Sequence, residues 1–195
     1  MIAKLAKSTA CFFVKNQLVE AEDEEVYAYG MEILLSTVFN LVIALGIALI
    51  TNTFLPCLIN LSAFVTIRIY AGGYHANTHE GCMLTLIMVQ GIFVLIIKTI
   101  SVETLKIFIP AMLIISIVII LRFAPVAHPN KPLSENLIIK LRRKAYISSL
   151  LWLTFTIVFM IIGKHNIGFY SSFGMFTISM AMIAEKIVLR RENGE

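Results

Sequence analysis

The chain has 195 residues, of which 58% are hydrophobic and only 14% are charged, and its formal net charge is +4 at pH 7. In an ordinary soluble domain about a quarter of the residues are charged. The low charged fraction of this chain therefore excludes that class and indicates a membrane protein. We therefore expect the lipid bilayer, and no nucleic acid, as a partner.

Residues 1–29 begin with lysines between hydrophobic residues and turn acidic between Glu20 and Glu25. This pattern predicts an amphipathic segment on the inner membrane surface, although a merely solvated leader would share its composition. The apolar patch between Lys7 and Lys15 is too short for the hydrophobic region of a cleavable signal peptide. We expect the segment to remain in the mature protein.

Long stretches without Asp, Glu, Lys or Arg follow, and the first is long enough to cross the bilayer twice. Thr51-Asn52-Thr53, with Pro56 just beyond, predicts a turn inside it. The pattern predicts an all-α, polytopic membrane protein in a single domain over residues 1–195, with about six transmembrane helices. The helices near 54–67 and 83–97 are short enough to be re-entrant. The uncharged stretches are 33–67, 83–97, 107–121, 145–162 and 165–184.

Residues 68–82 form a polar stretch near the middle of this apolar chain, and they contain both His75 and Cys82. A thiol and an imidazole at the end of a membrane helix are the two parts that a cysteine protease requires. On one straight helix their spacing would separate them by about 10 Å, so the chain between them must bend. Gly72 and Gly73 give the backbone the freedom for such a bend.

Two alternatives arise from the same residues. His79 could meet Cys82 from one helical turn away, and His75, His79 and Cys82 could together bind zinc. The sequence lacks the glutamate that zinc proteases carry beside their first histidine, so we expect no metal. If a helix begins near Cys82, its N-terminal amides favour a thiolate there.

Residues 122–144 form a second soluble element, a basic loop whose prolines prevent a continuous helix in its first half. With six crossings, every Lys and Arg except Lys98, Lys106 and Lys164 lies on one side of the membrane. The positive-inside rule then places both termini, residues 68–82 and the loop in the cytoplasm.

Three motifs resemble the accessory gene regulator B (AgrB) family of membrane endopeptidases, which act in the quorum sensing of Gram-positive bacteria. The most specific motif is Arg68-x3-Gly72-Gly73-x-His75-Ala76, followed by Cys82. The other two are Ala124-Pro125-x5-Lys131-Pro132 with the basic cluster after it, and Gly30-Met31-Glu32. Length and helix order extend the resemblance over essentially the whole chain.

The resemblance implies cleavage of an AgrD-like precursor peptide and cyclisation to a thiolactone or lactone autoinducing peptide in the bacterial cytoplasmic membrane, without a cofactor. Cys82 would be the nucleophile and His75 the general base. Glu32 would be an active-site neighbour, or simply an interfacial charge. A homodimer is left open, as is a noncatalytic transporter or scaffold with the same helices. Arg68, Gly72 and Gly73 would support the site, and the precursor's acidic part would bind Lys131, Arg142, Arg143 and Lys144.

Overall fold

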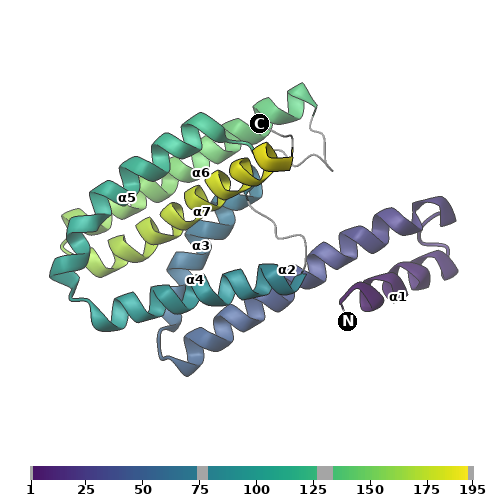
Figure 1. Ribbon diagram of the computed structural model, residues 1–195, viewed down its shortest axis with the longest axis horizontal. Helices are drawn as coiled ribbons and strands as arrows, with labels where there is room; N and C mark the ends of the chain where they lie inside the picture. The colour runs from purple at the N-terminus through teal and green to yellow at the C-terminus, as the bar shows by residue number, and fades with distance from the viewer. Residues whose placement is uncertain (1, 74–78, 127–133, 193–195) are drawn as a thin grey trace.

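The computed structural model describes residues 2–73, 79–126 and 134–192, and in these residues helices are the only regular secondary structure. Figure 1 shows how the seven α-helices of these described residues are arranged. The predicted all-α fold is confirmed.

The N-terminal segment is a helical hairpin. Helix α1 (Ile2–Lys15) and the short turn η1 (Ala21–Asp23) lead into α2 (Glu24–Ile50), and α1 lies alongside the first part of α2 (Figure 1). Ala6 and Ala10, one turn apart on α1, are fully buried because small side chains let two helices approach closely. The position of this hairpin on the membrane surface stays a prediction.

The predicted turn after α2 is confirmed at Thr51–Thr53, before α3 (Phe54–Ala71). Asn52 has a φ of 54°, a left-handed conformation that asparagine tolerates better than most residues. The Ile47 carbonyl in the last turn of α2 accepts from the Thr51 N–H over 3.0 Å and also from the Thr51 hydroxyl over 2.6 Å.

Four more helices complete the chain: α4 (His79–Thr99), α5 (Val102–Phe123), α6 (Glu135–Ile161) and α7 (His165–Glu192). Within the described residues, five helices are long and apolar enough to cross a membrane, namely α2, α3, α5, α6 and α7. The apolar part of α4, Met83–Thr99, is shorter, as the uncharged stretch 83–97 predicts. These helices indicate a membrane protein.

The helices form two layers. Helix α7 packs against both α5 and α6 in one layer, and α2 lies beside α4 in the other. Helix α3 crosses behind α7 and contacts both layers (Figure 1). A Cβ on Gly174 of α7 would lie 2.3 Å from the Asn60 carbonyl oxygen of α3, so only glycine permits this approach. Buried hydroxyls add directional contacts, such as the 2.8 Å bond between Thr156 of α6 and Ser171 of α7.

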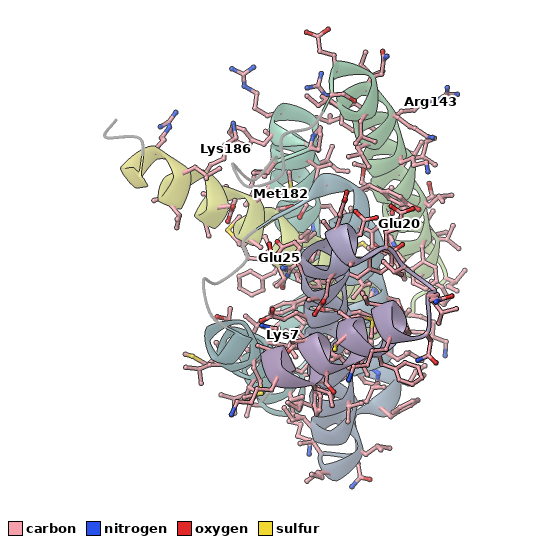
Figure 2. All side chains as sticks on the ribbon, turned by 90° about the vertical axis from the view of Figure 1, so that its right-hand side faces the viewer. Lys7, Glu20, Glu25, Arg143, Met182 and Lys186 are labelled. Carbon is pink, nitrogen blue, oxygen red and sulfur yellow. The ribbon has the colours of Figure 1, made fainter. Side chains whose placement is uncertain are left out.

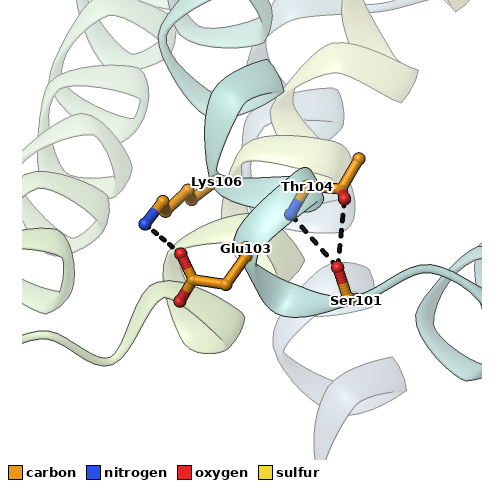
Figure 3. Close-up of polar contacts among 4 residues, drawn as sticks. All are labelled: Ser101, Glu103, Thr104 and Lys106. Carbon is orange, nitrogen blue, oxygen red and sulfur yellow. Dashed lines mark hydrogen bonds and ion pairs between the residues drawn. The ribbon is translucent and has the colours of Figure 1, made fainter.

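The turn between α4 and α5 is short because α5 begins at once with a capped end. The Ser101 hydroxyl accepts a hydrogen bond of 3.4 Å from the Thr104 backbone N–H, and Glu103 forms an ion pair with Lys106 (Figure 3). The cap satisfies one of the first N–H groups of α5. The charge pattern predicts that this end of the bundle faces the outside of the cell, and that orientation stays a prediction.

Candidate functional site

The chain leaves α3 through a glycine bend. Gly72 has φ 74° and ψ −158°, a conformation that is essentially restricted to glycine. Gly73 follows with a φ of 138°. The Gly72 N–H still donates to the Arg68 carbonyl over 3.0 Å, so the bend begins directly at the last turn of α3. The two glycines therefore redirect the backbone just before His75.

The segment that follows α5 holds this bend. The Val126 N–H donates to the Ala71 carbonyl over 2.9 Å, and a Cβ on Gly72 would lie 2.4 Å from the Val126 carbonyl oxygen. The first and second sequence motifs thus meet, backbone against backbone. This contact joins residues far apart in the chain and was not predicted from the sequence.

Helix α7 covers another side of the bend. A Cβ on Gly73 would lie 3.2 Å from Ile178 Cδ1 and 3.6 Å from Ala181 Cβ. One turn beyond Ala181, Glu185 is only 3% exposed and has interaction partners. Sequence reasoning missed Glu185, although it is the first charge after the uncharged stretch 165–184, and ionisable residues in membrane helices commonly mark functional sites.

Cys82 lies in the first turn of α4, just before the apolar part of that helix, Met83–Thr99. Because α4 begins at His79, Cys82 is the fourth residue of that helix. The first four N–H groups of a helix lack intrahelical partners, and this end of the helix dipole favours a thiolate. His75 and the side chains of His79 and Cys82 lie outside the described residues, so the pairing of Cys82 with either histidine stays a prediction. The described residues contain no metal-binding cluster of His, Cys, Asp or Glu.

The two other residues predicted to support the site, Arg68 and Glu32, lie on α3 and α2. Arg68 Cζ lies 5.3 Å from the centre of the Phe64 ring, and Arg68 has further interaction partners. Glu32 is half-buried on α2 and also has partners. Since α2 packs beside α4, Glu32 lies on a helix that adjoins the helix of Cys82. Its role as an active-site neighbour stays a prediction.

The helices reach further into residues 122–144 than the loop assignment predicts. Helix α5 continues to Phe123 and α6 begins at Glu135, so the basic cluster Arg142–Lys144 lies on α6. The physical reason is that no proline interrupts the chain after Pro132, and the acidic side chain of Glu135 is favourable in a first helical turn.

The three residues of the basic cluster, Arg142–Lys144, differ in what they contact. Arg142 Nε donates to the Ala124 carbonyl over 3.1 Å, and Lys144 Nζ lies 5.4 Å from the centre of the Tyr70 ring. Arg143 is exposed and points away from the bundle (Figure 2). Arg142 thus holds the end of α5 that contacts the glycine bend, whereas Arg143 faces outward. Lys131 lies outside the described residues.

We expect Gly72→Ala to destabilise the protein by about 2 kcal/mol or more, because alanine must adopt a glycine-only conformation. The added methyl group would also displace the Val126 carbonyl. Thermal unfolding in detergent measures the effect. Gly91→Ala on α4 is the matched control, since a Cβ there meets no atom within 4 Å. Equal unfolding temperatures for the two variants would contradict the described bend.

Comparison with known proteins identifies the family. The family model described as Accessory gene regulator B matches residues 6–186. Accessory gene regulator protein B of Staphylococcus aureus strain Newman is 31% identical over 160 residues, 82% of this chain and 78% of that protein. The protein of the same name from strain MW2 is 31% identical over 133 residues, covering 68% of this chain and 66% of its own length. The Staphylococcus intermedius protein is 29% identical over 128 residues, 64% of this chain and 65% of its own.

No solved structure matches the chain. The family model nevertheless includes α2 to α6 in full, the glycine bend, Cys82 and the basic cluster. Because that model and the Newman relative both cover most of the sequence, the chain belongs to the accessory gene regulator B family.

Proposed function

We propose that this protein is a membrane cysteine endopeptidase that cleaves an AgrD-like precursor and supports its cyclisation to an autoinducing peptide. Family membership supports a role in accessory gene regulator quorum sensing. The observation that carries the proposal is the position of Cys82 in the first turn of α4, downstream of the glycine bend that leads to His75.

The proposed first step is acylation of the cysteine. His75 takes the proton of the Cys82 thiol, and the Sγ atom attacks the carbonyl carbon of the scissile peptide bond. The C–N bond then breaks, and the histidine returns its proton to the leaving amine. The N-terminal fragment of the precursor remains attached to Cys82 as a thioester.

The proposed second step forms the ring. A thiol within the precursor fragment attacks the thioester, its proton passes to the base, and the Cys82 thiolate leaves and is reprotonated. One thioester replaces another, so the exchange is nearly balanced in energy and needs no nucleotide. An internal hydroxyl would give a lactone by the same route. A site at the membrane edge slows the competing attack by water.

Arg143, which points away from the bundle, is proposed to attract the acidic part of the precursor. Opposite charges raise the local precursor concentration and steer its approach. We expect Arg143→Gln to raise the dissociation constant of the precursor several-fold at low salt, with a smaller effect at high salt. Fluorescence anisotropy of a labelled precursor at two salt concentrations measures this effect.

Arg142→Gln is the matched comparison, because Arg142 is also exposed but donates a hydrogen bond to the Ala124 carbonyl. We expect it to lower thermal stability more than Arg143→Gln does. Since both charges also influence membrane insertion, correct topology is checked first by protease accessibility. Precursor binding that is unchanged in Arg143→Gln, with correct topology, would reduce this residue to a membrane anchor.

Thiol alkylation separates the enzyme from a noncatalytic transporter or scaffold. The test uses a Cys11→Ala, Cys57→Ala variant in lipid vesicles, in which Cys82 is the remaining thiol. We expect this variant to cleave a synthetic precursor, to lose cleavage after iodoacetamide and to keep it in the presence of a chelator. Cleavage that survives complete alkylation would contradict the cysteine mechanism, and loss to the chelator would favour a metal-dependent one.

A further inference from the structure

A pair of carboxamides links two helices, α3 and α4, in the interior of the protein. Asn60 of α3 is 3% exposed and Gln90 of α4 is 2% exposed. Asn60 Nδ2 donates to Gln90 Oε1 over 3.3 Å. The bond joins the helix that ends at the glycine bend to the helix that begins near Cys82.

The neighbouring contacts of α4 are apolar. Phe93, one turn from Gln90, is fully buried and packs edge-on against Tyr170, with the ring centres 5.9 Å apart. Its ring centre also lies 5.1 Å from that of Phe173. Ring contacts of this kind tolerate a range of geometries, whereas a hydrogen bond between two amides requires one alignment. The ring contacts join α4 to α7, and the amide pair, which joins α4 to α3, is the directional one among these contacts of α4.

The pair is not optimised for stability. Asn60 Oδ1 and Gln90 Nε2 are buried and have no hydrogen-bond partner. Unpartnered polar atoms in the interior are costly, so two apolar side chains of similar size would hold α3 and α4 together more stably. Buried polar pairs that cost stability in this way can specify the register of neighbouring helices.

We propose that Asn60 and Gln90 are positioning residues, which fix the depth and rotation of α4 and so place Cys82 for its reaction. This inference rests on the proposed function. Cys82 precedes Gln90 by eight residues, or about 12 Å along the helix. A slip of α4 by one residue would move Cys82 by about 1.5 Å and rotate it by about 100°. An error of about 1 Å in placing a catalytic group can cost about 100-fold in rate.

Gln90→Leu tests the inference in the otherwise intact protein. We expect the kcat for cleavage of a synthetic precursor to fall about 100-fold, while KM changes less than about threefold. We also expect the pH midpoint of Cys82 alkylation by iodoacetamide to rise towards that of a free thiol, about 8.5. A merely structural loss would lower the amount of folded enzyme and leave that midpoint unchanged.

Two double variants distinguish the hydrogen-bond alignment from simple packing. Asn60→Leu with Gln90→Leu restores a close apolar contact but has no hydrogen bond to align the helices. We expect its kcat to stay low, even where its stability exceeds that of the wild type. The exchange Asn60→Gln with Gln90→Asn keeps the amide pair and its combined length, and we expect it to recover most of kcat. A wild-type kcat in the double leucine variant would overturn the inference.

Thr156→Val is the matched control. It removes another buried hydrogen bond, between α6 and α7, away from α4. We expect it to keep both kcat and the alkylation midpoint. A normal kcat and midpoint in Gln90→Leu would also refute the positioning role, whereas cleavage by a Cys82→Ala variant would refute the proposed function instead.

Discussion

Cys82→Ala is expected to abolish precursor cleavage, by at least about 1,000-fold, without changing membrane insertion or helix content. The substitution removes the proposed nucleophile, whereas alanine remains favourable in the first turn of α4. Co-expression with the precursor, followed by separation of the fragments on a gel, measures the loss. Circular dichroism of the purified variant checks the helix content.

The other two cysteines are the controls for this result. Cys57 is fully buried in α3, 3.4 Å from the Thr53 hydroxyl, and Cys11 is half-buried on α1. We expect Cys11→Ala and Cys57→Ala to keep much of the cleavage activity, because neither residue is at the glycine bend or in the first turn of α4. Normal processing by the Cys82→Ala variant would refute the mechanism.

His75→Ala is expected to lower the rate of acylation about 100-fold or more, whereas His79→Ala should keep most of it. Helical spacing alone favours His79, which begins α4 three residues before Cys82. The family motif instead assigns the base to His75. His75 follows the end of α3 at Ala71 and the bend at Gly72 and Gly73, and it precedes the start of α4 at His79. The spacing rule for residues on one helix therefore does not apply to His75 and Cys82.

Single-turnover cleavage and the rate of Cys82 alkylation near neutral pH test the two histidines together. We expect both rates to fall in His75→Ala, because the imidazole that removes the thiol proton is lost. His75→Gln and His79→Gln serve as companions that retain a polar side chain. If the His79 variants are inactive and the His75 variants cleave normally, the base assignment is wrong.

Much of the fold could be predicted from the sequence because the bilayer imposes a strong constraint. Backbone polar groups find no water in the hydrocarbon core, so each long uncharged stretch must satisfy them within a helix. The break at Thr51–Thr53 was predictable for a different reason. Asparagine is common in tight turns because it tolerates the left-handed conformation, which Asn52 adopts here. The positions of the helices and of this turn can therefore be predicted from short stretches of sequence, without knowledge of how the helices pack.

The assembly of the site was less predictable, because its contacts join residues far apart in sequence. Hydrophobic periodicity does not predict the hydrogen bond from Val126 to Ala71 or the one between Asn60 and Gln90. Glu185 was visible as a charge, but its burial on α7, one turn beyond the contact of Ala181 with Gly73, follows from helix packing. Likewise, the basic cluster was recognised as positive, while the separate orientation of Arg142 depends on where α5 ends.

Detection of the acyl-enzyme tests the central claim most directly. A precursor whose ring-forming residue is replaced cannot complete the exchange, so its N-terminal fragment should accumulate on the enzyme. We predict a hydroxylamine-sensitive adduct that mass spectrometry of the digested protein assigns to Cys82. Complete cleavage of that precursor with no adduct on Cys82 at any time, or an adduct on another residue, would contradict a Cys82 thioester.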